Sequence, residues 1–126
     1  MAKKKVLKKL PEKFKENWMR DLRSGNLKQG KNYLKCGDTF CCLGVAYNMR
    51  NKSKWAKNHQ APEGMIMQTA NGYNDLLGEN DLPAKVMDVF NQDYNSDRTV
   101  QDYLAYLNDV RDWKFPAIAN WIEKNL

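Results

Sequence analysis

The chain has 126 residues, of which 42% are hydrophobic and 29% are charged, and its formal net charge is +6. This length is close to the usual size of one domain, and the four Trp, six Tyr and four Phe exclude a disordered tail or linker. No apolar run approaches the roughly 20 residues of a membrane span, and the basic start lacks the apolar stretch of a signal peptide. We therefore expect one compact domain in the cytosol, with its three cysteines reduced.

The charges are distributed unevenly along the chain. Residues 1–35 contain 12 Lys/Arg and 3 Asp/Glu, whereas residues 71–126 contain 5 and 10. A basic N-terminal third attracts nucleic acid or an acidic protein surface, and the alternative is that the two ends of the chain attract each other within the fold. We expect residues 1–9 to form a flexible basic arm ahead of a single domain over residues 10–126.

The first predicted element is a helix over residues 11–23. Phe14, Trp18 and Leu22 recur every four residues and form one apolar stripe. Ser24-Gly25 ends this helix, because Gly25 adopts positive φ easily. A polar connector is predicted over residues 26–31.

A β-hairpin is predicted over residues 32–42, because two β-prone runs flank Gly37-Asp38. A two-residue turn makes Cys36 face Thr39, and Cys42 then lies on the second strand. A helix is expected over residues 43–50, where Gly44 allows close approach of a neighbouring element. Residues 51–63 are predicted as a loop, residues 65–67 as a short strand, and residues 71–80 as a turn-rich segment.

Three helices are predicted in the C-terminal third. Pro83 begins the first, Ser96 or Asp97 caps the second, and Pro116 begins the third. Short connections between them indicate a packed cluster. The predicted fold class is therefore α+β, with a small antiparallel sheet around residues 32–42, an N-terminal helix and a C-terminal cluster of about three helices.

Several short strings together resemble a pattern that recurs in small tailed-phage proteins of unknown function. These strings are Trp18, Leu22-Arg23-Ser24-Gly25, Lys28-Gln29-Gly30, Cys41-Cys42-Leu43-Gly44-Val45, Leu107-Asn108-Asp109, Phe115, Ile118-Ala119 and Ile122-Glu123. The resemblance runs from about residue 18 to residue 123, but residues 51–80 and the Lys-rich start do not match. It implies a bacteriophage origin and a non-structural accessory role in the host cytoplasm, and it implies no catalytic residues.

The cysteines and the single histidine do not form a convincing metal or catalytic motif. Cys36, Cys41, Cys42 and His59 are zinc-type ligands, but adjacent cysteines on a strand point to opposite faces. A cysteine nucleophile needs a base and an orienting group, and no spacing indicates them. Buried, structural thiols are the favoured interpretation, and we expect no metal, no cofactor and no enzymatic activity.

Two further features remain open at the level of sequence. The carboxylates of residues 75–102 have four alternative interpretations. They form a solvated acidic face, cap helices, act as paired acids in hydrolysis, or mimic the charge of nucleic acid. Aromatic residues near lysines, such as Tyr33 with Phe40 and Lys54-Trp55, serve either as core residues or as platforms for bases.

The basic segment after the first predicted helix is the candidate binding site. It contains Arg23, Lys28, Gln29 and Lys31, and its free backbone N–H groups suit an anion. A helix C-cap followed by a surface connector is the structural alternative.

Two functional hypotheses follow from this segment. The first is a non-enzymatic, phage-type accessory protein that binds nucleic acid or an acidic host protein through Lys3, Lys4, Lys5, Arg23, Lys28 and Lys31. The second is a protein that sequesters a small, nucleotide-like anion in a pocket between the first helix and the hairpin, through Arg23, Gln29 and Lys31, to act against host defence.

Overall fold

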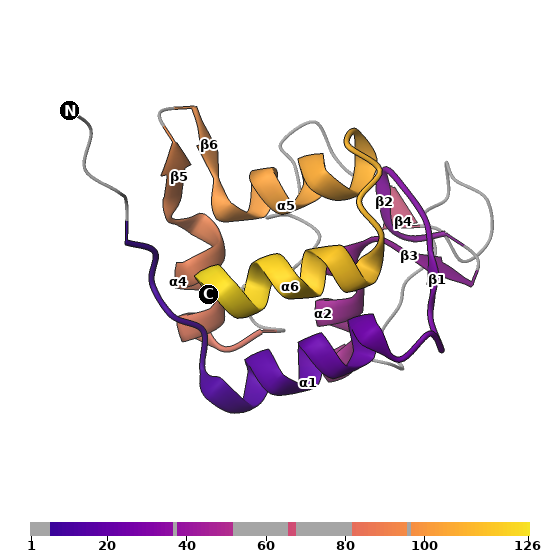
Figure 1. Ribbon diagram of the computed structural model, residues 1–126, viewed down its shortest axis with the longest axis horizontal. Helices are drawn as coiled ribbons and strands as arrows, with labels where there is room; N and C mark the ends of the chain where they lie inside the picture. Colours follow the sequence, from indigo (N-terminus) through magenta and orange to yellow (C-terminus); the bar gives the residue numbers. More distant parts are fainter. Residues whose placement is uncertain (1–5, 37, 52–65, 68–81, 96) are drawn as a thin grey trace.

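The computed structural model describes residues 6–36, 38–51, 66–67, 82–95 and 97–126 (Figure 1). The helices are α1 (Glu12–Arg23), α2 (Cys42–Asn51), α4 (Ala84–Asn91), α5 (Val100–Asp109) and α6 (Phe115–Asn125). The strands are β1 (Lys28–Gln29), β2 (Tyr33–Cys36), β3 (Thr39–Phe40), β4 (Ile66–Met67), β5 (Asp93–Asn95) and β6 (Arg98–Thr99). The fold class is α+β, as the sequence predicts.

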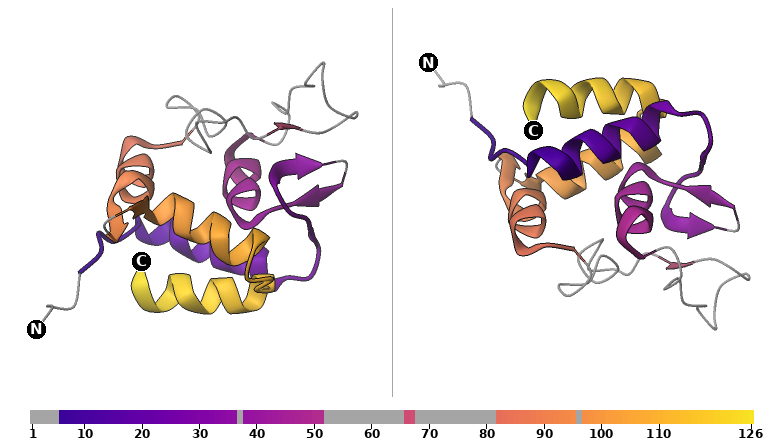
Figure 2. Two further views of the ribbon diagram at one scale, coloured as in Figure 1. Left: turned by 90° about the horizontal axis from the view of Figure 1, so that it is seen from above. Right: turned by 90° about the horizontal axis from the view of Figure 1, so that it is seen from below.

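Helix α1 lies along α6, and it also contacts α2 (Figure 2). Its predicted stripe of Phe14, Trp18 and Leu22 is buried, and Trp18 is fully inaccessible. The indole of Trp18 donates from Nε1 to the carbonyl of Cys42 at 3.0 Å, which satisfies its polar atom inside the core. Gly25 has a φ of 77°, so the helix ends where the sequence predicts.

The predicted hairpin forms with the predicted register. Strands β2 and β3 are antiparallel, and Cys36 pairs with Thr39. The predicted strand near residue 66 is β4, which pairs with β2 in antiparallel fashion. The polar connector predicted over residues 26–31 is wrong in one respect, because it contains β1, which pairs with β3 in parallel fashion. The sheet order is β1-β3-β2-β4.

The predicted position of Cys42 on a strand is wrong, because Cys42 is the first residue of α2. Cys41 precedes the helix, and its Sγ accepts a hydrogen bond from the Gly44 N–H at 3.4 Å, where a hydroxyl or carboxylate cap usually sits. The predicted close approach at Gly44 is confirmed, since a Cβ atom there would lie 1.8 Å from the carbonyl oxygen of Leu34.

The three predicted C-terminal helices are present as α4, α5 and α6. The predicted cap of the second helix is wrong, because α5 is capped by Thr99 and not by Ser96 or Asp97. The Thr99 hydroxyl accepts from the Asp102 N–H at 3.2 Å, and the Asp102 carboxylate accepts from the Thr99 N–H at 3.5 Å. The residues just before α5 instead form the small antiparallel ribbon of β5 and β6, at the opposite end of the molecule from the four-stranded sheet (Figure 1).

The segment before α1 is part of the packed structure from Leu7 onward. Leu7 and Leu10 are buried, and the Leu10 N–H donates to the Leu126 carbonyl at 3.0 Å. The Lys8 N–H donates to Gln92 Oε1 at 2.8 Å. The predicted flexible arm over residues 1–9 is therefore wrong for Leu7 to Lys9, which contact the rest of the domain. Residues 1–5 lie outside the described residues.

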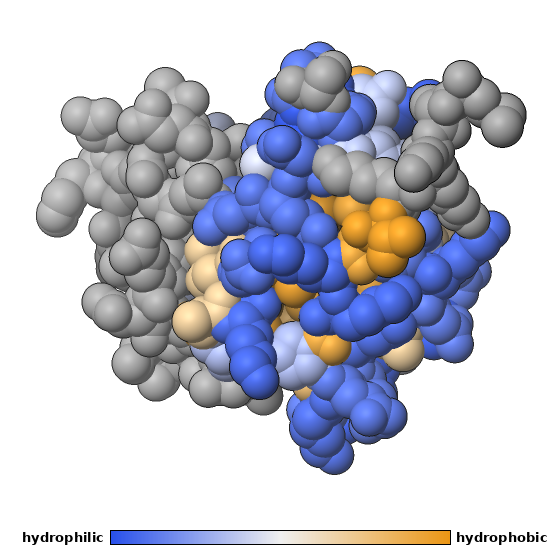
Figure 3. Space-filling model, turned by 90° about the vertical axis from the view of Figure 1, so that its left-hand side faces the viewer, coloured by the Kyte–Doolittle hydropathy of each residue, from blue (hydrophilic) through white to orange (hydrophobic). Residues whose placement is uncertain are grey.

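Most of the coloured surface in Figure 3 is hydrophilic, with a smaller hydrophobic area. Among the described residues, the exposed large hydrophobic side chains are Val6 and Val110, at 86% and 67%. In the same part of the chain, no helix has the length and apolar character needed to cross a membrane.

Candidate functional site

Arg23, one of the predicted binding residues, is held against α6. Its Nη2 donates to Glu123 Oε1 and to Asn120 Oδ1, both at 2.7 Å. Arg23 lies in the last turn of α1, so its positive charge also interacts favourably with the negative end of that helix dipole. This contact supports the structural alternative of a helix end whose arginine is used within the fold.

The two predicted lysines of this segment also have carboxylate partners. Lys28 Nζ lies 3.1 Å from Asp38 Oδ2, and Lys31 forms an ion pair with Asp112. The hydrogen bond and the positive charge of each lysine lower the pKa of its carboxylate partner. These pairs are solvent-exposed and therefore weak, but each lysine has a negative charge beside it.

Gln29 belongs to an internal hydrogen-bond network with Asn108 of α5. Gln29 Nε2 donates to Asn108 Oδ1 at 2.9 Å and to the Trp113 carbonyl at 2.7 Å. Its Oε1 accepts from the Phe115 N–H at 3.0 Å. The Gln29 side-chain amide is thus engaged by the segment that connects α5 to α6.

The Asn108 side chain completes this network. It is fully buried, and its Oδ1 also accepts from the Cys42 N–H at 3.1 Å, at the start of α2. Its Nδ2 donates to the Gly30 carbonyl and to Asp109 Oδ1, both at 2.8 Å. The residues that carry the family resemblance therefore join β1, α2, α5 and α6 through one satisfied polar network.

The adjacent thiols are buried and have no nucleophilic character at neutral pH. Burial raises the pKa of Cys41 to about 12 and raises the pKa of Cys42 well above its usual range. Only a thiolate attacks or binds metal readily, so neither thiol is activated. Within the described ranges, no group of His, Cys, Asp and Glu side chains is arranged to hold a metal ion. His59 and the side chain of Cys36 lie outside the described residues.

Of the two alternatives left open for the aromatic residues of the hairpin, Phe40 follows the core interpretation. Phe40 is 7% exposed, and Lys35 Nζ lies 5.6 Å from the centre of its ring. A base has no access to a buried ring face, so Phe40 is a core residue. Lys54-Trp55 lies outside the described residues, as do Lys3, Lys4 and Lys5.

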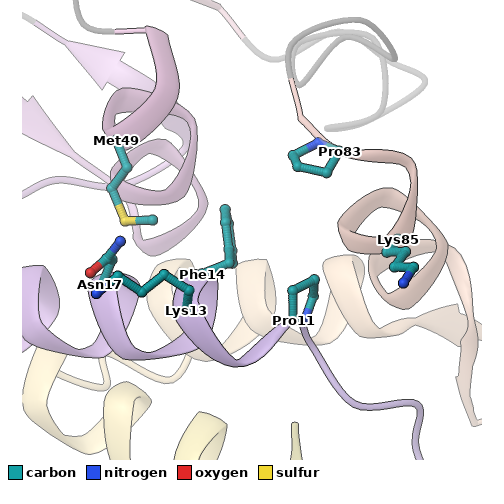
Figure 4. A pocket seen from close by; sticks show the side chains of 7 residues that line it. All are labelled: Pro11, Lys13, Phe14, Asn17, Met49, Pro83 and Lys85. Carbon is teal, nitrogen blue, oxygen red and sulfur yellow. The ribbon is translucent and has the colours of Figure 1, made fainter.

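A pocket opens at the other end of α1, where this helix, α2 and α4 meet (Figure 4). Its volume is about 270 Å³. Apolar atoms come from the residues at the start of α1 and α4 and from the end of α2. The lining residues are Pro11, Lys13, Phe14, Asn17, Met49, Pro83 and Lys85.

Two lysines flank this pocket, at opposite ends of the opening in Figure 4. Lys13 lies on α1 beside Asn17, and Lys85 lies in the first turn of α4. Among the residues that the structure describes, neither lysine has an acidic partner within ion-pair distance. Within the described ranges, the charges of Lys13 and Lys85 are thus not offset by an ion pair, in contrast to those of Arg23, Lys28 and Lys31.

The two helices that form the pocket begin in the same way. Pro11 and Pro83 occupy the cap positions, with φ of −54° and −56°, and no side chain caps either helix. Each helix thus directs the positive end of its dipole and uncapped N–H groups to this region, although Glu12 on α1 opposes the effect. Sequence reasoning missed this site, and the only signal was the repeated spacing of Pro11 with Lys13 and Pro83 with Lys85.

Comparison with known proteins identifies a family whose description names no activity. A family model described as "Domain of unknown function (DUF8296)" matches residues 10–126. No curated protein and no solved structure matches the chain. The matched stretch contains every described helix and strand, and it includes the pocket and the Gln29–Asn108 network.

Proposed function

The chain belongs to the DUF8296 family, whose description assigns no activity, and we propose that it is a non-enzymatic protein that binds a negatively charged partner at the pocket between α1, α2 and α4. The proposal keeps positive charge as the source of affinity, but only Lys13 of its two central contacts lies in the basic N-terminal third. It moves the central contacts from the 23–31 segment to Lys13 and Lys85. The bacteriophage origin, the accessory role and the host cytoplasm implied by the resemblance belong to the same proposal.

The observation that carries the proposal is the difference between two sets of basic residues. Arg23, Lys28 and Lys31 each contact a carboxylate of the same chain. Lys13 and Lys85 border a concave surface and have no such partner among the described residues. An incoming anion gains more from a charge that is not already compensated, since a paired lysine must first give up its partner.

The concave shape favours this attraction. Low-dielectric walls concentrate the field of nearby charges, and both exposed lysines border such a wall. Lysine also has a long flexible stem, so each ammonium group can turn toward a ligand that lies between Lys13 and Lys85. Phosphates and carboxylates are the anions that such an arrangement recognises.

The test compares two double variants of equal charge. Lys13→Glu with Lys85→Glu removes the pocket cations, and Lys28→Glu with Lys31→Glu makes the same change in net charge in the predicted segment. Wild type and both variants are eluted from immobilised heparin and from single-stranded DNA cellulose in a salt gradient. We expect the pocket variant to elute at distinctly lower salt than the segment variant, because its cations make the primary contacts.

Equal shifts for the two variants would show that the anion responds only to overall charge, and the proposed site would then be wrong. A larger shift for the segment variant would return the site to Lys28 and Lys31. Circular dichroism of both variants controls for folding. All four substituted side chains are exposed, so the substitutions are expected to change the free energy of unfolding by no more than about 0.5 kcal/mol.

A further inference from the structure

We infer that the pocket takes a small ligand made of one planar aromatic group with an acid group attached, of which a nucleoside monophosphate is an example. The inference rests on the proposed function, because it assigns a ligand class to the same pocket. It goes further in that the apolar wall, and not only the two lysines, selects the ligand.

The wall of the pocket suits a flat ring. Pro11 and Pro83 present rigid rings that lack an N–H, and Met49 closes the side toward α2, whereas Phe14 is 7% exposed and adds little surface (Figure 4). Apolar surfaces such as these proline rings pack against flat aromatic rings, and the thioether of methionine makes favourable contacts with ring edges. A phosphate or carboxylate alone leaves this apolar surface in contact with water.

The polar groups of the pocket suit the acid group and one ring substituent. Lys13 and Lys85 supply ammonium donors, and Asn17 supplies both an amide donor and a carbonyl acceptor. The Asn17 side chain makes no hydrogen bond with the described residues, so its amide is available to a ligand. An uncharged aromatic molecule would desolvate the lysines without compensation, which disfavours it.

The size of the pocket sets the size of the ligand. Its volume of about 270 Å³ is just below the roughly 300–1,000 Å³ of pockets that enclose drug-sized molecules. One ring system with its acid group fills that space, whereas a dinucleotide does not fit within it. The pocket therefore holds one such unit, and we assign it to a small molecule.

The experiment dissects the ligand into its two parts. Isothermal titration and thermal unfolding are recorded for the whole protein with 1-naphthyl phosphate, 1-naphthol, inorganic phosphate and adenosine monophosphate. We expect 1-naphthyl phosphate to bind at least about tenfold more tightly than either 1-naphthol or phosphate, and to raise the melting temperature. Adenosine monophosphate is expected to behave as 1-naphthyl phosphate does.

A pair of variants separates the apolar wall from the charges. Met49→Trp fills the pocket and leaves Lys13 and Lys85 in place, and Met19→Trp makes the same substitution at a partly buried position outside the pocket. We expect Met49→Trp to weaken binding of 1-naphthyl phosphate at least about tenfold, and Met19→Trp to leave the affinity for 1-naphthyl phosphate unchanged.

The outcomes distinguish this inference from the proposed function. Equal affinities for 1-naphthyl phosphate and phosphate would overturn the inference, and this comparison needs only the wild-type protein. The proposed function would survive that result if Lys13→Glu with Lys85→Glu still lowers the salt concentration at which the protein elutes from heparin. Tight binding of single-stranded DNA that Met49→Trp abolishes would instead place a base of a nucleic acid in the pocket, and it would overturn the assignment to a small molecule.

Discussion

Cys41 and Cys42 illustrate how burial decides the chemistry of a side chain. Both are fully inaccessible, and Cys41 Sγ accepts a hydrogen bond from the Gly44 N–H while Cys42 Sγ donates to the Leu104 carbonyl at 3.5 Å. A thiolate at either position would lose its hydration without gaining a cation. The two thiols therefore act as small core residues and as hydrogen-bonding groups at the start of α2.

This environment predicts low thiol reactivity in the folded protein. At about pH 8, we expect Ellman's reagent to modify at most one of the three cysteines, and all three after unfolding in guanidinium. Rapid modification of two or more thiols without denaturant would contradict the burial of Cys41 and Cys42.

The raised thiol pKa also makes the free energy of unfolding depend on pH. A pKa raised to about 12 in the folded state means that the stabilisation is present below the ordinary thiol pKa and is lost as the pH rises toward 12.

At the scale of elements, Asn108 links segments that lie far apart in the sequence. Its amide contacts β1 through Gln29, the Gly30 carbonyl that follows β1, and the first N–H of α2. All four hydrogen-bonding positions of the amide are used inside the protein. Such a network is stable only when complete, because each member that loses its partner stays buried.

We therefore expect Asn108→Ala to lower the free energy of unfolding by at least about 3 kcal/mol, measured by urea denaturation. The substitution leaves the Cys42 N–H, the Gln29 amide and the Gly30 carbonyl without their partner. Asn120→Ala on α6 is the matched control, because Asn120 is exposed, and a change within about 0.5 kcal/mol is expected there. Similar denaturation midpoints for the two variants would show that the buried network contributes little.

Helices were predictable at this scale, and contacts between them were not. The apolar periodicities of α1, α4, α5 and α6 are local, so the sequence predicts those helices and their buried faces. Strand β1 escaped prediction because its two polar residues become a strand only through the parallel pairing with β3. The start of α2 escaped because the partner of its first N–H is Asn108, which is far along the chain.

The candidate site shows the same limit. Lys13 and Lys85 are separated by most of the chain, and only the packing of α1 against α2 and α4 brings them to one pocket. The basic segment from Arg23 to Lys31 was conspicuous in sequence because its charges are close together. Its carboxylate partners Asp112 and Glu123 come from the far end of the chain, so the sequence allowed attraction between the two ends but did not identify the residues that pair.

At the scale of the whole molecule, part of the charge asymmetry is used within the fold. Lys8 pairs with Asp88 at 2.7 Å, Arg23 with Glu123 at 2.7 Å, and Lys31 with Asp112. These pairs link the basic N-terminal third to the acidic C-terminal half, which is the alternative that the charge distribution allows. Because all of them are exposed, each contributes little to the free energy of unfolding, and salt weakens them further.

Apolar contacts stabilise the packing of the segment before α1 against the core more than these ion pairs do. Leu7 is 8% exposed, whereas the neighbouring Val6 is 86% exposed. We expect Leu7→Ala to lower the free energy of unfolding by about 2 kcal/mol, because it removes buried apolar surface and leaves a cavity beside the core. Val6→Ala is the matched control, and a change within about 0.5 kcal/mol is expected for it.

Urea denaturation of both variants checks this prediction. A loss of stability confined to Leu7→Ala means that the domain begins before Leu10 and that the basic segment leaves the fold at a fixed point, next to Gln92 and the C-terminal Leu126. Equal, small effects for both variants would mean that residues 6–9 form part of a free arm. Its lysines, including Lys8 and Lys9, would then be available to an anionic partner in addition to the pocket.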